Sequence, residues 1–244
     1  TVDAAMVSSA GETAVSAVSL VDAINILFIT IFNGMSVGGG VIISQYVGHR
    51  DYKQAKASSN QMLYVTVAVA LVFMGLLLCL QEQVLHWLYP TIEQDVFENC
   101  KTYLFITLWG YPFSAIGGAS VYVLRAMGKN RQAATTTISF NVVNVIGNAI
   151  LIYGFKMGVA GAAIATTASR IAYAIMGLSL AGNKKMNVHF EKLLKFKLDF
   201  HLIRRIVRIG SASSLENGLF HGGWYRKPNQ RAYTVCFQSA YGAD

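Results

Sequence analysis

The sequence predicts an all-α, polytopic membrane helix bundle, and three observations lead to this fold class. The chain contains five long stretches without a formal charge, its composition is strongly apolar, and the charges of the intervening segments alternate in sign. A helix needs about 20 mostly apolar residues to cross the hydrocarbon core of a bilayer. Lipid offers the backbone no hydrogen-bond partners, so each such stretch is expected to be a helix. The stretches are Ala23–Val47, Met62–Leu80, Tyr103–Leu124, Ala133–Phe155 and Met157–Ser169, the last continuing across Arg170 to Gly182.

The composition is typical of a membrane protein and not of a soluble domain. Of the 244 residues, 54% are hydrophobic and 13% are charged, whereas soluble domains carry roughly 25% charged residues. The net charge of +8 comes from basic residues in the loops, so membrane topology accounts for it and no nucleic-acid partner is expected. The three cysteines have neither a disulfide pattern nor a metal-ligand spacing. The apolar stretches lack histidine clusters and activated nucleophiles, so we expect no enzymatic activity and no cofactor.

Loop charge predicts which helix ends lie in the cytoplasm. Lys and Arg accumulate on the cytoplasmic side of membrane proteins. The basic segments His49–Asn60, Arg125–Gln132 and Asn183–Arg205 are therefore predicted to be cytoplasmic. The acidic segment Gln81–Lys101 and the short turn at Lys156 are predicted to be external. The expected location is the cell membrane, which the chain would cross several times.

The two ends of the apolar region predict two further helices. We interpret Thr1–Ala10 as the outer end of a helix whose beginning precedes the sequence, and Gly11–Thr13 as a turn. The first complete helix is expected to start near Ala14. At the other end, Ile206–Phe220 begins another apolar helix, which contains Glu216.

Small residues and one proline predict how some helices pack. Gly34, Gly38, Gly39 and Gly40 crowd the first stretch. Small residues let membrane helices approach closely, so helix contact is favoured over ligand contact as the role of these glycines. Pro112 is expected to bend the third stretch, because proline removes a backbone donor.

Four ionisable residues fall within the predicted helices: Asp3, Asp22, Arg170 and Glu216. A charge at the bilayer centre costs about 2.5–3.5 kcal/mol on insertion scales, so such residues usually face the bundle interior. They predict either an ion or proton site or an interhelical pair, for example Arg170 with Asp3. For Asp22 we favour a third interpretation, a position at the wet outer end of its helix.

Three asparagines lie on one stripe of the fourth predicted helix. Asn141, Asn144 and Asn148 have the spacing i, i+3 and i+7, which puts their amides on one face. They predict either interhelical hydrogen bonds, worth about 0.6 kcal/mol each, or the lining of a polar cavity. Amide oxygens beside a carboxylate suit Na⁺, and they suit a hydrogen-bonded proton carrier equally well.

Several blocks of the sequence resemble one family of membrane proteins, and their order and spacing over Thr1–Phe220 agree with it. The family is that of the multidrug and toxic compound extrusion (MATE) transporters. The blocks are Val2-Asp3-Ala-Ala-Met6, Gln45-Tyr-Val-Gly-His-Arg-Asp-Tyr-Lys53, Leu124-Arg-Ala-Met-Gly-Lys-Asn-Arg131, Asn144-Val-Ile-Gly-Asn148, Tyr153-Gly154 and Gly158-Val-Ala-Gly-Ala-Ala-Ile-Ala-Thr166.

The resemblance implies twelve helices in two six-helix lobes. This chain would hold one partial lobe: residues 1–182 as the N-terminal transmembrane lobe with a truncated first helix, and 183–205 as a basic cytoplasmic linker between the lobes. Residues 206–221 would be the start of helix seven. Residues 222–244 match nothing in the family, and we interpret them as a tail that follows a change of reading frame or a join near His221.

The resemblance also implies the residues of the transport site. Asp3 matches an acid of the family's first helix that is implicated in cation coupling. Asn148 takes a position that is Asp in part of the family, so the site would have one carboxylate fewer. The implied cation-coupling residues are Asp3, Asn144, Asn148 and Glu216. From the position of polar residues within the spans, we also expect Asn141 and Arg170 in the substrate cavity.

The function that the resemblance implies is secondary active efflux of organic, drug-like and often cationic substrates by antiport with Na⁺ or H⁺. No metal is expected beyond Na⁺ at the coupling residues, and a second lobe would be needed for function. Two alternatives stay open. One is an inactive truncated membrane fragment. The other is a lipid-linked oligosaccharide flippase of the same superfamily, which would be expected to carry more deep basic residues than Arg170.

Overall fold

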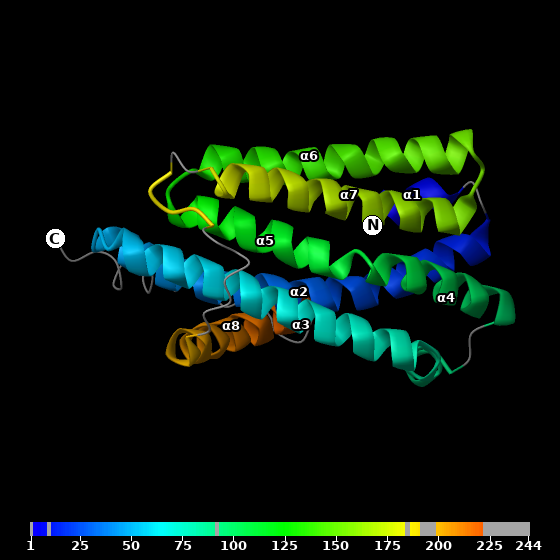
Figure 1. Cartoon of the computed structure of the whole chain (residues 1–244). Helices are drawn as coiled ribbons and strands as arrows, with labels where there is room; N and C mark the ends of the chain where they lie inside the picture. Colours follow the sequence, from blue (N-terminus) through cyan, green and yellow to red (C-terminus); the bar gives the residue numbers. More distant parts are fainter. Residues whose placement is uncertain (1, 9–10, 91–92, 184–185, 191–198, 222–244) are drawn as a thin grey trace.

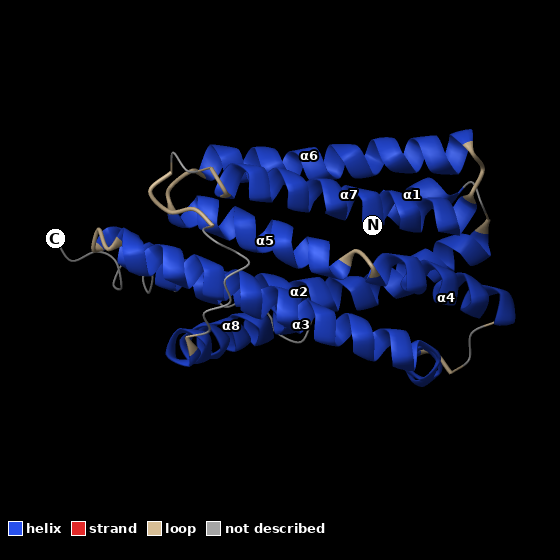
Figure 2. Ribbon diagram, in the orientation of Figure 1, coloured by secondary structure: helices blue, strands red, loops and turns tan. Residues whose placement is uncertain are grey.

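A computed structural model describes residues 2–8, 11–90, 93–183, 186–190 and 199–221, with backbone alone for residues 2 and 217–221. Throughout this part of the chain the regular structure is helical, which confirms the all-α prediction (Figure 2). The helices are α1 (Val2–Val7), α2 (Glu12–Gly48), α3 (Tyr52–Leu88), α4 (Gln94–Leu108), α5 (Tyr111–Ala126), α6 (Asn130–Asn148), the π-helical turn η2 (Ala149–Gly154), α7 (Gly158–Ala181) and α8 (Phe200–His221).

Each predicted apolar stretch lies in a helix, or a pair of helices, that is a candidate membrane span. Among the described residues, α2, α3, α6 with η2, and α7 are each long and apolar enough to cross a bilayer, and the bent pair α4–α5 makes a fifth candidate if it is counted as one span. The helices run roughly along one common direction, with α4 and α5 following one another end to end (Figure 1). The polytopic bundle that the sequence predicts is therefore confirmed.

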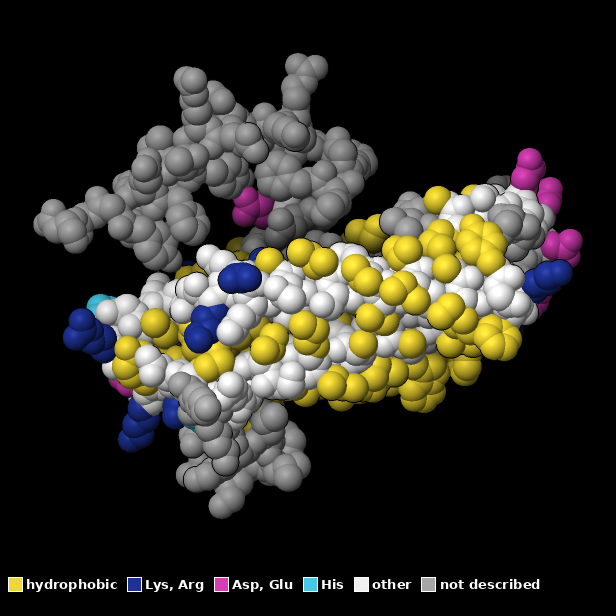
Figure 3. Space-filling view, turned by 90° about the horizontal axis from the view of Figure 1, so that it is seen from above, with side chains coloured by type: hydrophobic (Ala, Val, Ile, Leu, Met, Phe, Trp, Pro, Cys, Tyr) yellow, Lys and Arg dark blue, Asp and Glu magenta, His cyan; other side chains and the backbone are white. Residues whose placement is uncertain are grey.

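Charge separates the two ends of the bundle. Most of the visible Lys and Arg side chains gather at one end and most of the Asp and Glu side chains at the other, with hydrophobic side chains between them (Figure 3). The turns after Gly48 and Ala126 and the end of α7 at Ala181 share one end, as the alternating loop charges require. That this basic end faces the cytoplasm remains a prediction.

The third span is broken, as Pro112 predicts. Helix α4 ends at Leu108, α5 begins at Tyr111, and the two axes differ by 49°. Pro112 lies in the first turn of α5 and has no N–H, so the carbonyl of Leu108 loses its helical donor. At the break the Gly110 N–H donates to the carbonyl oxygen of Thr107 at 3.0 Å.

A glycine seam joins α2 to α8, and we define it by Gly34, Gly38 and Gly210. A Cβ atom added to Gly38 would lie 2.6 Å from the backbone nitrogen of Gly210 and 2.6 Å from the carbonyl oxygen of Ile206. The two backbones therefore touch, which only small residues permit. Helix contact, the favoured role of the α2 glycines, is confirmed here.

Helix α8 begins earlier than the sequence predicts. The side chain of Asp199 accepts hydrogen bonds from the backbone N–H groups of His201 (3.0 Å) and Leu202 (3.3 Å), so Asp199 caps a helix that starts at Phe200. The predicted boundary at residue 206 is therefore too late, and residues 200–205 of the predicted linker are helical. The predicted tail, residues 222–244, lies outside the described residues.

Candidate functional site

Asp3 lies at the centre of a polar cluster built from four helices. Its carboxylate, half-buried on α1, accepts hydrogen bonds from Asn148 Nδ2 of α6 at 2.6 Å and from Thr166 Oγ1 of α7 at 3.0 Å. The hydroxyl of Tyr103 on α4 lies 3.3 Å from the same carboxylate. Three donors from three different helices therefore converge on one acid.

Asn144 completes this network on α6. Its Nδ2 donates to Thr166 Oγ1 at 3.2 Å, and its Oδ1 accepts from Asn148 Nδ2 at 3.5 Å. Asn148 is fully buried, yet its Oδ1 has no hydrogen-bond partner among the residues that the structure describes. A buried acceptor without a donor carries a free-energy penalty, which a cation or a proton donor bound there would remove.

Asp22 also belongs to this cluster, so its expected position at a wet helix end is wrong. The side chain is 7% exposed, and its Oδ1 lies 3.0 Å from the hydroxyl of Tyr103. Position along a helix does not decide burial here, because α2 turns this face toward α4. We call Asp3, Asp22, Tyr103, Asn144, Asn148 and Thr166 the acid site.

A π-helical turn follows Asn148 directly. In η2 the backbone N–H of Phe155 donates to the carbonyl oxygen of Ile150, five residues earlier, at 3.1 Å. Such turns often occur at functional sites, where they change the direction of neighbouring side chains. Tyr153 of η2 donates its hydroxyl hydrogen to the carbonyl oxygen of Met6 at 3.1 Å, which ties this turn to α1 and so to the helix of Asp3.

A second polar group lies one helical turn further along α4, at the break before α5. Arg170 of α7 is 3% exposed, and its Nη1 donates to the carbonyl oxygen of Thr107 at 2.8 Å. Its guanidinium lies over the ring of Tyr111, 5.7 Å from the ring centroid. Asn25 Nδ2 of α2 lies 3.5 Å from Thr107 Oγ1. We call Asn25, Thr107, Tyr111 and Arg170 the break site.

The expected pair of Arg170 with Asp3 is not formed within the described part of the chain, where the ion pair found is Lys101 with Glu82. The carbonyl oxygen of Thr107 accepts both the Gly110 N–H at the break and Nη1 of Arg170, so the guanidinium is engaged at the break and not at Asp3. Gly110 makes room for this contact, since a Cβ there would lie 2.6 Å from Cδ of Arg170.

Three residues from the predicted site lie apart from the acid site. Asn141 is exposed, and its Nδ2 donates to the carbonyl of Thr137 in its own helix at 3.1 Å, so only two of the three asparagines meet at the acid site. Glu216 lies exposed on α8 and takes part in none of the acid-site hydrogen bonds described above. Arg170 is buried in contact with α4, and its place in a substrate cavity remains a prediction.

Sequence reasoning did not select Tyr103 and Thr166 for the site, although a spacing pattern marks them. Each is followed four residues later by another polar residue, Thr107 and Arg170 respectively. Polar pairs at i and i+4 share one face of a helix. In an apolar span, such a pair indicates a face turned toward other helices.

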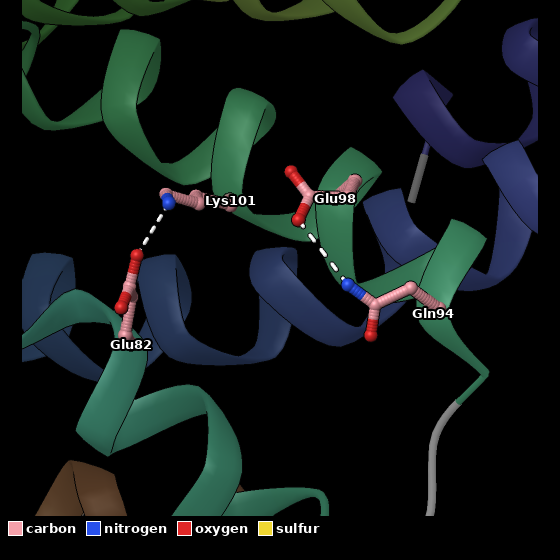
Figure 4. Close-up of polar contacts among 4 residues, drawn as sticks. All are labelled: Glu82, Gln94, Glu98 and Lys101. Carbon is pink, nitrogen blue, oxygen red and sulfur yellow. Dashed lines mark hydrogen bonds and ion pairs between the residues drawn. The ribbon is translucent and has the colours of Figure 1, made fainter.

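The acidic end of the bundle combines charged side chains with a cavity. Lys101 of α4 forms an ion pair with Glu82 of α3, and Gln94 Nε2 donates to Glu98 Oε1 at 3.4 Å (Figure 4). A cavity of about 600 Å³ opens between α2, α4, η2 and α7, and Tyr153 is among its lining residues. Because Tyr153 also contacts α1, this cavity lies next to the helix that carries Asp3.

The fold and the buried acid site define an integral, multi-pass membrane protein of the transporter type, since buried ionisable residues in such bundles mark ion or substrate pathways. The chain belongs to the MatE family, whose sequence model matches residues 1–150. Members of this family are transporters and not enzymes.

Two curated relatives illustrate the similarity. The chain is 25% identical over 225 residues to the uncharacterized transporter YisQ of Bacillus subtilis, covering 88% of this chain and 47% of YisQ. It is 27% identical over 161 residues to the multidrug export protein MepA of Staphylococcus aureus (strain NCTC 8325 / PS 47), covering 66% of this chain and 35% of MepA. The chain therefore spans about half or less of the length of these relatives.

Solved structures agree on the fold. The crystal structure of a MATE protein in the bent conformation matches with a TM-score of 0.82 and 22% identity, covering 88% of this chain and 48% of the other. The inward-facing conformation of a multidrug resistance MATE family transporter of the MOP superfamily matches with a TM-score of 0.81 and 22% identity, covering 87% and 48%. The bundle thus has the fold of half a MATE protein.

Proposed function

We propose that this chain supplies the N-terminal lobe of a secondary active exporter that exchanges an entering cation for an outgoing organic substrate. The observation that carries the proposal is the Asp3 carboxylate, held by donors from α4, α6 and α7. A carboxylate that links several helices can bind a cation or a proton, and binding would then change the contacts between those helices. This is the property that coupling requires.

The coupling ion in this proposal is Na⁺ or H⁺. Na⁺ binding is supported by oxygen atoms near Asp3, including the unpartnered Oδ1 of Asn148. Proton uptake is compatible with the contacts of Asp3 with Tyr103 and Thr166, because each hydroxyl can turn from donor to acceptor when the carboxyl gains a proton. Asn144 and Asn148 would be coupling residues with Asp3, and Glu216 would act in a site completed by a second lobe.

The proposed division of the chain follows from family membership and the helix bounds. Residues 1–182 would form the N-terminal lobe, the segment after it a cytoplasmic linker, and α8 the first part of helix seven. A second lobe would complete the pathway for substrates. Drug-like organic substrates are supported by the name of MepA, a multidrug export protein.

A lipid-linked oligosaccharide flippase is the less favoured alternative. Such a protein needs free basic groups for an anionic pyrophosphate. Arg170, the deep basic residue of this lobe, is instead engaged by the carbonyl of Thr107 and the ring of Tyr111.

Transport by proteoliposomes tests the proposal. The chain is reconstituted alone and as a fusion to the second lobe of YisQ, and export of a fluorescent organic cation is measured under an imposed Na⁺ gradient or an imposed pH gradient. We expect the fusion to export the dye under one of the two gradients and the chain alone to be inactive. Asp3→Asn should abolish export, because the amide cannot take up a proton and binds Na⁺ weakly.

Glu82→Gln is the matched control, since it also neutralises one acid but lies exposed at the outer end. It should export at the rate of the unsubstituted fusion. Equal export by the Asp3→Asn and unsubstituted fusions would contradict the proposed role of Asp3. A folded fusion that exports nothing under either gradient would favour the alternative of an inactive fragment.

A further inference from the structure

The hydroxyl of Tyr103 lies between two carboxylates that come from different helices. Its oxygen is 3.0 Å from Oδ1 of Asp22 on α2 and 3.3 Å from Oδ2 of Asp3 on α1. Both distances are within hydrogen-bonding range, and Tyr103 itself is fully buried. The buried hydroxyl therefore bridges one buried acid, Asp22, and one half-buried acid, Asp3.

One hydroxyl hydrogen cannot satisfy both contacts. A phenol has a single O–H, whereas an ionised carboxylate can only accept. If both acids were ionised, one of the two contacts would set a carboxylate oxygen against an oxygen lone pair, which is repulsive. Both contacts become hydrogen bonds when one of the two carboxyls carries a proton.

The charges around Tyr103 also indicate one bound proton. Arg170 on α7 is the cation that acts on Tyr103 together with Asp3 and Asp22. Two carboxylates and one guanidinium leave one net negative charge, and one added proton makes this group neutral. Asp3 is half-buried, whereas Asp22 and Arg170 are buried, and neutrality is favoured most where water is excluded. The titratable or charged groups described around Tyr103 on the packed helices are Asp3 of α1, Asp22 of α2, Tyr89 after α3, Cys100 of α4, Tyr111 of α5 and Arg170 of α7.

We infer that Asp22 is a second proton-binding carboxyl of the acid site, joined to Asp3 through the hydroxyl of Tyr103. Three donors stabilise Asp3 as a carboxylate, and Asp22 is the more buried of the two acids, so we place the proton on Asp22. The Asp22 O–H donates to Oη of Tyr103, and the Tyr103 O–H donates to Oδ2 of Asp3. Proton transfer breaks these two O–H bonds and forms one at Tyr103 and one at Asp3, so that atoms and charge balance.

The unpartnered amide of Asn148 agrees with this assignment. Asn148 is neutral, is fully buried and directs its Nδ2 to Asp3, while its Oδ1 remains without a described donor. A neutral amide at that place leaves α6 without an acid for the site. Asp22 therefore supplies from α2 the second carboxyl that α6 lacks. The role of Asp22 in coupling rests on the proposed function, whereas the presence of a proton on Asp22 does not.

Infrared spectroscopy of the full chain in lipid nanodiscs tests this inference, because a protonated carboxyl has a carbonyl stretch distinct from that of a carboxylate. Among the acids whose side chains are described, only Asp3 and Asp22 are not exposed. We expect a protonated-carboxyl band at neutral pH that shifts in D₂O. Asp22→Asn should remove this band, and the exposed control Glu82→Gln should retain it. A wild-type chain without the band, or a band that persists in Asp22→Asn, would overturn the inference.

Tyr103→Phe keeps both acids and provides a second test should Asp22→Asn fail to fold. Loss of the bridging hydroxyl should move the band to higher frequency, because the protonated carboxyl loses its acceptor. An unchanged band in a folded Tyr103→Phe chain would overturn the inference. The infrared measurement does not depend on transport, so the two proposals can fail separately. If the fusion exports the dye but the band is absent, this inference alone is refuted. If the band is present but the fusion exports nothing, the proposed function alone is refuted.

Discussion

The two halves of α2 make contacts of opposite kinds. In the N-terminal half, Asp22 and Asn25 reach α4 through hydrogen-bonding side chains. In the C-terminal half, Gly34 and Gly38 let the backbone of α8 approach until no side chain fits between the two helices. One helix is thus held by polar groups at one end and by close backbone contact at the other.

This difference indicates which helix contacts of α2 can change during function and which cannot. Hydrogen bonds to a carboxylate weaken or reorganise when a proton or cation binds, so the contacts of the acid site depend on the ions present. The glycine seam has no titratable group among Gly34, Gly38 and Gly210, and its contact depends on shape. We expect α2 and α8 to move as one unit, and the helices around Asp3 to shift relative to one another.

The largest expected effect comes from Gly38→Ala. The new Cβ would lie 2.6 Å from backbone atoms of α8, which cannot move aside as a side chain can. Overpacking of this kind costs about 3 kcal/mol, measured as the free energy of unfolding in lipid. The matched control is Gly75→Ala in α3, where a Cβ meets nothing within 4 Å. Equal stability of the two variants would contradict the close contact.

Thr166→Val should have an intermediate effect, confined to the acid site. Valine has nearly the same shape but cannot donate to Asp3 or accept from Asn144, which are 3.0 and 3.2 Å from Oγ1. Loss of these bonds should cost about 1–2 kcal/mol of unfolding free energy. Cross-linking between α2 and α8 should remain as in the wild type. A loss of that cross-link would show that the two halves of α2 are not independent.

Gly110→Ala should have a smaller effect, because the atom in its way belongs to a flexible side chain. The added Cβ would lie 2.6 Å from Cδ of Arg170, which can shift at a cost of about 1 kcal/mol. A double-mutant cycle with Arg170→Ala isolates this contact. Alanine has no Cδ, so it should remove most of the penalty of Gly110→Ala, and a penalty that persists would place the strain in the backbone of the break.

Glu82→Gln should have the smallest effect. The pair of Glu82 with Lys101 joins α3 to α4 at the outer end (Figure 4). Both side chains are solvent-accessible, so salt screens their attraction. We expect no measurable change in unfolding at physiological ionic strength. A clear loss of stability would mean that the outer end contributes more than its exposure indicates.

The sequence predicted well where the membrane-spanning helices lie, but it predicted poorly which face of each helix is buried. Uninterrupted apolar stretches mark membrane helices because lipid admits few alternatives, and Pro112 marked the break correctly. Asp22 was misplaced because distance from a helix end says nothing about rotation about the helix axis. The start of α8 was missed because its basic residues suggest a loop, although Asp199 is an N-cap residue.

The acid site was only partly predictable. Asp3, Asn144 and Asn148 stand out as polar residues in apolar stretches, and the structure brings these three together. Tyr103 and Thr166 do not stand out, because tyrosine and threonine are common in membrane helices. Their roles depend on which helices become neighbours, and a single sequence does not contain that information in local patterns.

The π-helical turn after Asn148 has a consequence for how this protein can vary in length. A π-turn contains one residue more than the α-helical turn it replaces, so residues 149–154 include one residue that an α-helix would not need. Deletion of a single residue there would restore regular helix and leave Asn144 and Asn148 in register. Deletion of one residue elsewhere in α6, away from the turn, would rotate the residues before the deletion by about 100° relative to those after it. Relatives with a shorter version of this helix are therefore expected to have lost their residue at this turn.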